Sequence, residues 1–299
     1  MENILQIFVS GIISGTIYAL VASGFLLVFK SSKIFNFAQG DLLLLLAYIS
    51  MTVFSMGLPL GVGLVALVLF AIGMGICLER FLFRPLMGQP LLSLVMMTLV
   101  LSVLIRGICY LLWRGDMYSY QGLSSSKVLS FWGVKVSIVG IITLVATFAV
   151  IGVCGAIFKY TKTGLAMRTM AEDSLVARSL SIRLSVVLGV TWAGATLLAG
   201  LGGLLLGANY GIGMHMSEFG LRAIPAALLG GLESLGGVVV GGLILGIAEQ
   251  MTVGLIDPML QKLGIQGVSV GSLVPYIVIV AVLLVKPYGL FGLRRIERV

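Results

Sequence analysis

Polar residues interrupt the apolar sequence between Lys30 and Asp41, in the stretch KSSKIFNFAQGD. The amide side chains of Asn36 and Gln39 can offer hydrogen bonds that apolar helices lack. A glycine such as Gly40 can supply a bend, and Asp41 can accept from the exposed amide groups that begin a helix. This stretch predicts an interruption of the membrane helices beside a pathway, with Asp41 capping the next helix. An ordinary cytoplasmic turn is the alternative.

Glycine pairs mark a second candidate site in the apolar region from 223 to 256. Short or glycine-interrupted apolar segments are typical of the binding sites of membrane transporters. Tight helix packing is the alternative, and both readings can hold, because glycines four residues apart let another backbone approach closely. The candidate pathway glycines are Gly230, Gly231, Gly236 and Gly237.

The longest polar part of the chain, Lys159 to Arg183, contains five basic and two acidic residues. Helix-forming residues are frequent in Leu165–Met170 and Ser174–Leu180, and Asp173 can cap the second piece. The pattern predicts a short ordered helix. It would lie on the membrane surface, fold against the bundle, or insert into a groove of a soluble cytoplasmic partner.

Motifs for catalysis, metals or nucleotides are missing from the sequence. Cys77, Cys109 and Cys154 lie in apolar surroundings without metal-ligand spacing, and His215 stands alone. No serine has a histidine or lysine base at a recognisable spacing, and no glycine-rich phosphate loop is present. We therefore expect a chain that is no enzyme and holds no metal or cofactor. Its charge of +8 is explained by basic loop ends better than by nucleic acid.

Composition defines the elements that position these residues. Of 299 residues, 59% are hydrophobic and 10% charged, against about 25% charged in soluble domains. The uncharged stretch Ile4–Phe29 exceeds the roughly 20 residues that cross a bilayer, and such unbroken blocks do not suit a barrel. The absence of a basic residue from Met1 to Gln6 argues against a cleavable signal peptide. We expect an all-α, polytopic membrane bundle of about eight transmembrane helices, forming a single domain over residues 1–299.

The apolar blocks also predict where the helices cross. The basic loop at 159–183 and the basic tail from Lys286 should both be cytoplasmic, which requires an even number of crossings between them. The region Ala223–Ile256 must therefore break near Pro225 and the glycine pairs, into Ala223–Leu232 and Gly237–Ile256, which either cross or re-enter. The other predicted spans are Ile4–Phe29, Leu42–Met56, Leu60–Leu78, Leu91–Leu112, Ser137–Phe158, Val186–Leu206 and Ser272–Val285.

Four blocks of the sequence resemble signatures of the branched-chain amino acid ABC-importer permeases. Together they span most of the chain, and the shorter LivH type is the most similar because an extra amino-terminal extension is lacking. Two positions depart from the family pattern: Gln39 stands where histidine is frequent, and Glu233 where small residues are common. The blocks are 15–20 with 34–41, 164–182 followed by 199–203, 226–237, and 286–292.

The resemblance implies the partners and the role of the basic loop. Two permease chains, usually a heterodimer in the bacterial inner membrane, would form the pathway. Two cytoplasmic ATPases would bind ATP and magnesium, and a periplasmic binding protein would deliver a branched-chain or related small amino acid. The loop 159–185 would be the coupling element, with residues 166–180 seated on an ATPase. Its candidate contact residues are Gly164, Arg168, Glu172, Asp173, Leu175, Val176, Arg178 and Leu180.

Two alternatives stay open beside this expectation. The same machinery could import urea, a short amide or a small carboxylate, because affinity resides mainly in the binding protein. A secondary carrier that needs no ATPase would use intramembrane charges for ion coupling, for which Glu233 and Glu249 are the candidates. The ordered basic loop favours the importer over the carrier.

Overall fold

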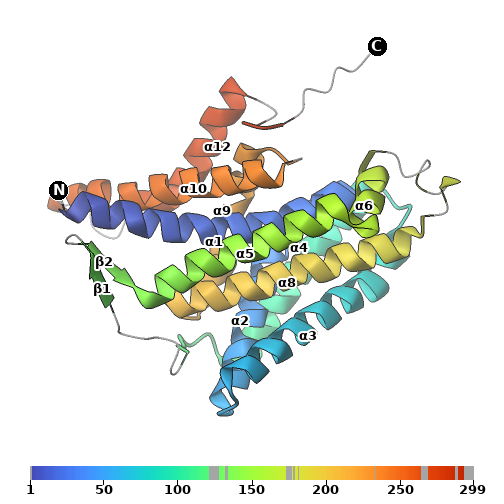
Figure 1. Cartoon of the computed structure of the whole chain (residues 1–299), viewed down its shortest axis with the longest axis horizontal. Coiled ribbons are helices and arrows are strands. Elements are labelled where there is room, and N and C mark those ends of the chain that lie inside the picture. Colours follow the sequence, from blue (N-terminus) through green and yellow to red (C-terminus); the bar gives the residue numbers. More distant parts are fainter. Residues whose placement is uncertain are drawn as a thin grey trace. The chain divides into compact units, whose positions relative to one another are not determined.

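The computed structural model describes residues 2–120, 128–131, 134–172, 177, 179–180, 182–232, 234–263, 269–286 and 289–292. Most of these residues are helical (Figure 1). The helices are α1 (Glu2–Ser32), α2 (Gln39–Ser55), α3 (Leu60–Leu78), α4 (Leu91–Trp113), α5 (Ile138–Tyr160), α6 (Lys162–Glu172), α8 (Leu184–Tyr210), α9 (His215–Gly230), α10 (Leu235–Met251), α11 (Asp257–Lys262) and α12 (Val274–Val285).

The helices confirm the predicted all-α membrane bundle. Within the described residues, six helical segments are long and apolar enough to cross a membrane, and two shorter apolar segments, 39–55 and 270–285, accompany them. Short π or 3-10 turns extend α3 through residues 79–86 and α10 through 252–256. Apolar length alone predicted most of these boundaries, because a bilayer requires about 20 apolar residues for each helical crossing.

The predicted break between residues 223 and 256 is present, at residues 231–234 between α9 and α10. Gly231 has a φ of +90° there, a conformation that residues with a side chain rarely adopt. The expectation that Pro225 belongs to the break is wrong, because α9 begins at His215 and continues through Pro225 to Gly230. The glycine conformation therefore ends the helix, and the proline does not.

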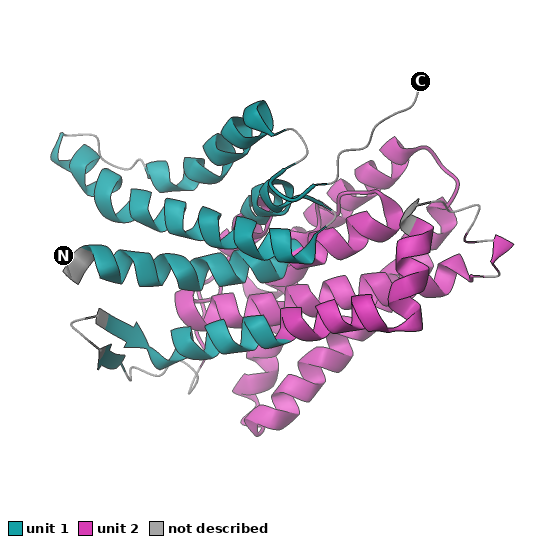
Figure 2. Cartoon of the chain, turned by 45° about the horizontal axis from the view of Figure 1, so that its top comes forward, with its two compact units in different colours: residues 1–22, 125–149, 222–299 teal, residues 23–124, 150–221 magenta. Residues whose placement is uncertain are grey.

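The chain packs as two compact units (Figure 2). Residues 23–124 and 150–221 form one unit, which is built around α2. In this unit α2 packs against α3, α4 and α8, and every residue from Leu42 to Tyr48 is at most 7% exposed. A helix enclosed in this way lies in protein on all sides along that stretch, so its polar residues need protein partners.

Residues 1–22, 125–149 and 222–299 form the other unit. Here α1 and α10 approach so closely that a Cβ on Gly15 would lie 2.8 Å from the Leu243 Cα, and one on Gly242 would lie 2.6 Å from the Ala19 nitrogen. The four-residue spacing of glycines on α10 thus serves helix packing, as small residues commonly do in membranes.

A two-stranded hairpin also belongs to this unit, although the sequence predicted no strands. Strands β1 (Val128–Phe131) and β2 (Val134–Ser137) pair antiparallel, with Val128 opposite Ser137. The Gln6 side chain donates to the Lys135 carbonyl and accepts from the Lys135 amide, each at 2.8 Å. This pairing fixes the hairpin to the start of α1.

Candidate functional site

The helix interruption predicted around residues 36–41 is the connection between α1 and α2. Helix α1 ends at Ser32, and Lys33 has a φ of +57°, so the chain turns six residues before α2 begins at Gln39. Asn36 and Gln39 are fully buried. The Asn36 Oδ1 accepts from the Ala38 amide at 3.2 Å, as in an Asx turn.

The amide groups of this connection bond to each other and to α8. Asn36 Nδ2 donates to Gln39 Oε1 at 3.1 Å, and Gln39 Nε2 donates to the Ala195 carbonyl at 3.0 Å. The Gln39 amide also fills the space beside Gly24, where a Cβ would collide with it. Both side chains therefore hold the start of α2 against α1 and α8. Their predicted role beside a pathway stays a prediction.

Gly40 does not supply the bend that the sequence predicted. It lies inside the first turn of α2 and has no positive φ. Its missing side chain instead allows contact with α9, since a Cβ on Gly40 would collide with the Ser217 carbonyl, and one on Gly220 with the Gly40 backbone. The positive φ at Lys33 belongs to the turn, and Gly40 serves close packing.

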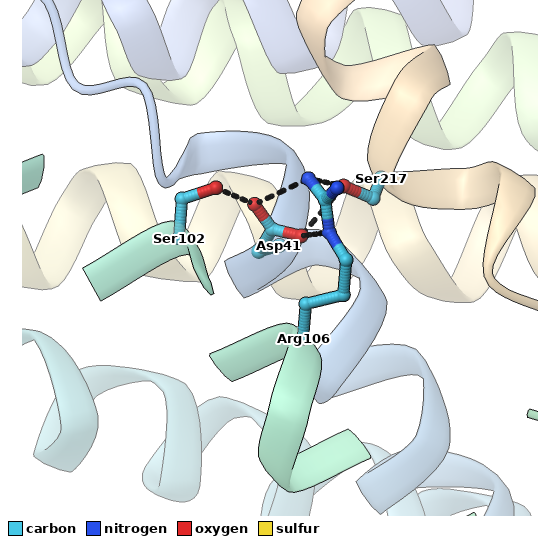
Figure 3. A network of polar contacts seen from close by, with 4 residues as sticks. All are labelled: Asp41, Ser102, Arg106 and Ser217. Carbon is cyan, nitrogen blue, oxygen red and sulfur yellow. Dashed lines mark hydrogen bonds and ion pairs between the residues drawn. The ribbon is translucent and has the colours of Figure 1, made fainter. Parts of the chain in front are cut away.

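Asp41 also differs from its predicted capping role. No side chain caps α2, because Asp41 lies within the helix and points its carboxylate at two other helices (Figure 3). Arg106 Nε on α4 lies 3.1 Å from Asp41 Oδ1. Ser217 on α9 donates to the same oxygen at 2.5 Å, and Ser102 on α4 donates to Oδ2.

The two side chains of the ion pair differ in exposure. The Asp41 side chain is fully buried, whereas that of Arg106 is 46% exposed. Arg106 Nη2 also donates to Ser217 Oγ at 3.0 Å. Removing one partner of a buried pair leaves an uncompensated charge and costs far more than the pair contributes. Asp41 and Arg106 compensate each other's charge, so the network joins α2, α4 and α9 without leaving an unpaired charge.

The sequence contained a signal for this network that the predicted site residues missed. Arg106 is the sole charged residue between Leu91 and Leu112, and an ionisable residue within an apolar span is a functional candidate with a partner to be found. Ser102 precedes it by four residues and so shares its helix face. The partners on α2 and α9 are far away in the chain and leave no local pattern.

The other end of α2 is held by the loop that follows α4. Tyr48 donates to the Asp116 carbonyl at 3.2 Å, and the hydroxyls of Ser50 and Tyr120 lie 2.6 Å apart. Burial raises the pKa of the Tyr120 hydroxyl well above its ordinary value, so this group stays a hydrogen-bond donor over the physiological pH range. Helix α2 is thus fixed by polar contacts at both ends.

A second intramembrane charge cluster lies in the unit that contains α10. Tyr18 on α1 donates to Glu249 Oε2 at 2.6 Å, and Arg222 Nη1 on α9 lies 3.3 Å from Glu249 Oε1. Glu249 is 7% exposed. The residue that favoured an ion-coupled carrier is therefore part of an ion pair. Glu233, the other such candidate, lies outside the described residues.

The predicted pathway glycines lie at the break between α9 and α10, where they pack against backbone. A Cβ on Gly230 would collide with the Gly237 carbonyl group, and one on Gly231 would lie 2.7 Å from the Gly292 nitrogen. A Cβ on Gly236 would face open space, because the nearest atom to it would be Ser234 Oγ at 3.9 Å. Ser234 caps α10 by accepting from the Gly237 amide at 3.0 Å. The close contacts belong to packing, and a role in a pathway stays a prediction for all four.

Residues 289–292 pack against this break. The Leu290 amide donates to the Leu229 carbonyl at 2.8 Å, and a Cβ on Gly289, whose φ is +77°, would approach the Leu228 carbonyl at 2.5 Å. Two of the sequence blocks that carry the family resemblance, 226–237 and 286–292, are thus neighbours in the fold.

The predicted coupling loop begins with α6, which is fixed tightly to the end of α5. Thr161 caps α6 by accepting from the Gly164 amide at 3.1 Å, and a Cβ on Gly164 would collide with the Phe158 carbonyl. Arg168 lies over the Phe158 ring, 5.8 Å from its centroid. Leu180 is 63% exposed. Asp173, Leu175, Val176, Arg178 and the Glu172 side chain lie outside the described residues.

Comparison with known proteins agrees with the fold. Residues 7–283 match the family described as "Branched-chain amino acid transport system / permease component". The high-affinity branched-chain amino acid transport system permease LivH of Escherichia coli K12 is 26% identical, over 99% of this chain and 97% of its own. BraD of Pseudomonas aeruginosa, described in the same words, is 27% identical over 99% and 98%.

A further permease and a solved structure agree as well. A probable branched-chain amino acid transport permease LivH of Methanocaldococcus jannaschii is 27% identical over 96% of this chain and 92% of its own. The solved structure of PsaBC from Streptococcus pneumoniae in complex with Fab has a TM-score of 0.50 and 13% identity, over 97% of this chain and 94% of the other. That likeness concerns the fold.

These observations define the class of protein first. Several helices long and apolar enough to cross a membrane, packed around the enclosed helix α2, make a multi-pass membrane protein. The match over residues 7–283 then identifies the family: the chain belongs to the branched-chain amino acid transport permeases. It is a transport subunit by family.

Proposed function

We propose that this chain is a membrane-spanning subunit of an ATP-binding-cassette importer that moves branched-chain or related small amino acids into the cytoplasm by alternating access. The observation that carries the proposal is the nearly end-to-end match to permeases named for branched-chain amino acid transport. Its setting is the bacterial inner membrane. Its partners are a second permease, two cytoplasmic ATPases and a periplasmic binding protein.

In the proposed mechanism, separate partners shift one equilibrium, between the inward and outward forms of the permease. ATP binding to the ATPases and delivery of solute by the binding protein favour different forms of the permease. Neither changes the populations without a difference in affinity for the two forms. The chain itself needs only a stiff connection to the ATPases and a pathway that opens alternately on each side.

The proposed connection is the loop 159–185, with residues 166–180 seated on an ATPase. Its support is the rigid attachment of α6 to α5: the Thr161 cap and the close contact at Gly164 leave little freedom at this joint. Movement of a partner against α6 would therefore be transmitted to α5, which is a candidate membrane span.

The proposed pathway lies beside the connection between α1 and α2. The support is indirect: Asn36 and Gln39 hold the start of α2, and Asp41 links α2 to α4 and α9. Arg106, nearly half exposed within an apolar helix, is best stabilised where water or a polar partner reaches it. A water-filled pathway next to Arg106 would provide this.

Reconstitution into liposomes with all four proposed partners tests the function. We expect uptake of labelled leucine, isoleucine or valine that requires both internal ATP and the binding protein. Urea, acetamide and propionate, tested at equal concentration, separate the proposed cargo from the alternative ones. Uptake of leucine by liposomes that contain no ATPase would contradict the importer and support a secondary carrier.

A further inference from the structure

A groove of about 510 Å³ lies between α3 and α8. The two helices run antiparallel and touch at Gly75, whose added Cβ would collide with Thr196. Beside this contact, residues spaced three or four apart form one stripe on each helix. The groove lies between the stripes, and its apolar lining includes Ile72, Ile76, Val186, Val190, Gly194 and Leu197.

Small residues keep the groove open. A Cβ on Gly189 would meet only Glu79 Oε2, at 3.9 Å, so its surface faces open space. Ile76, Val186 and Val190 are 46%, 55% and 42% exposed. Helices α3 and α8 are both candidate membrane spans, so in a bilayer these exposed apolar side chains would be covered by lipid chains or by another apolar surface.

One end of the groove is charged. Glu79 is buried there and pairs with Arg84, whose Nε lies 3.2 Å from Glu79 Oε1 and whose side chain is 45% exposed. Arg80 follows Glu79 and is exposed, and the exposed Arg183 immediately precedes α8. Arg80 is the chain neighbour of Glu79, and Arg183 lies two residues before the lining residue Ser185, so this end of the groove carries three arginines for one carboxylate and is positively charged.

The length of the groove matches one leaflet. Its lining on α8 extends from Ser185 to Leu197, a rise of about 18 Å at 1.5 Å per residue. Half of a hydrocarbon core is about 15 Å. The charged lining residues, Glu79 and Arg84, lie together at one end of the groove.

We propose that this groove binds an anionic phospholipid from the leaflet that borders Arg84. One acyl chain lies along the stripe from Val186 to Leu197, and the phosphate and anionic headgroup lie against Arg84, Arg80 and Arg183. Basic pockets between membrane helices on the cytoplasmic side commonly bind such headgroups. Two predicted spans, Leu91–Leu112 and Ser137–Phe158, separate residues 79–89 from the loop predicted to be cytoplasmic, so these residues are expected on that side as well. The proposal does not depend on which solute the permease transports.

Photo-crosslinking of the full-length chain in nanodiscs tests the site. The probe is a phosphatidylglycerol with a photoreactive group on one acyl chain, mixed into phosphatidylcholine, and the labelled peptides are identified by mass spectrometry. We expect labelling within residues 186–197, and a large loss of it in Gly189→Leu, which fills the groove. Gly73→Leu is the matched control, because Gly73 lies on α3 in open space.

A second variant tests the headgroup without disturbing the Glu79–Arg84 pair. Arg80→Gln combined with Arg183→Gln should lower the preference for phosphatidylglycerol over an equally labelled phosphatidylcholine. Each arginine near an anionic headgroup contributes about fivefold, or about 1 kcal/mol. Equal labelling of the unchanged protein by the two lipids would overturn the proposal. So would labelling that stays the same in Gly189→Leu, or labelling of residues 186–197 that disappears when the second permease is assembled.

Discussion

Asp41 is the residue on which polar contacts from two other helices of its unit converge. Its carboxylate accepts from Ser102 and Ser217 and pairs with Arg106. Charge-assisted hydrogen bonds of this kind are about twice as strong as neutral ones. Because the carboxylate is fully buried, its stability depends on all of these partners together, and a single side chain joins α2 to the two helices from which they come.

The change Asp41→Asn preserves size and one acceptor but removes the charge. It leaves Arg106 without its counter-ion, and we expect a loss of about 2–4 kcal/mol in the free energy of unfolding, less than for a fully buried pair because Arg106 is partly exposed. Unfolding in mixed detergent micelles measures this. The double variant Asp41→Asn with Arg106→Gln should recover part of the loss, and a double variant no better than Asp41→Asn would contradict the pairing.

Replacing Asn36 and Gln39 by alanine tests the proposed pathway at the same scale. The change removes the bonds to Ala38 and Ala195 and the polar surface next to α2. We expect lower uptake without lower membrane expression, measured in cells that supply all partners. Unchanged uptake in the alanine variant would contradict the proposed role.

At the scale of elements, glycine contacts decide which helices meet. Helices α1 and α10 touch through Gly11, Gly15, Gly242 and Gly246, where added Cβ atoms would meet the backbone of the opposite helix. Lipid tails are as apolar as the helices, so close packing must supply the attraction in place of the hydrophobic effect. A larger residue cannot be accommodated without separating the helices.

The change Gly246→Leu should separate α1 from α10. Overpacking of a tight contact costs about 1–3 kcal/mol and occasionally more, so we expect a lower folded yield and a lower midpoint of thermal unfolding in detergent. Gly152→Leu on α5 is the matched control, because an added Cβ at Gly152 meets open space. Equal loss in both variants would show that the close contact is not the cause.

The role proposed for the loop 159–185, binding to an ATPase, can be tested separately from the folding of the chain. Leu180 is exposed, and Leu175 is another of the apolar residues predicted to face an ATPase. Leu175→Asp with Leu180→Asp should abolish co-purification of the ATPases while leaving the amount of folded permease unchanged. Met56→Asp, at an exposed residue between α2 and α3, is the control. Retention of the ATPases by the loop variant would contradict the proposed contact.

At the scale of the whole molecule, the chain is one part of a larger machine in the proposed function. In that function the energy for transport comes from the two ATPases. The two compact units are connected by α1, α5 and α9, each of which contributes residues to both. A conformational change between inward and outward forms would therefore act through continuous helices.

Assembly is the measurement that belongs to this scale. Co-expression with a second permease and two ATPases should yield one stable complex in which this chain and the second permease are present in equal amounts. Native mass spectrometry of the purified complex gives the composition. A complex that contains two copies of this chain and no second permease would replace the proposed heterodimer by a homodimer and leave the family assignment unaffected.

The sequence by itself determined the class, the spans and the broken helix. Apolar length sets how many helices can cross a bilayer, and glycine pairs mark where helix α9 must end. The resemblance to permeases also rests on local blocks, and the family match confirms it. These features depend on neighbouring residues, so they can be predicted without knowledge of the fold.

The tertiary structure alone decided what the polar residues contact. Asp41 was expected to cap its own helix, yet its partners lie 61, 65 and 176 residues away in the chain. Gly40 was expected to bend the chain, yet its lack of a side chain allows α9 to pack closely against α2. A buried carboxylate takes whichever donors packing brings within about 3 Å, and packing joins residues that no local spacing connects.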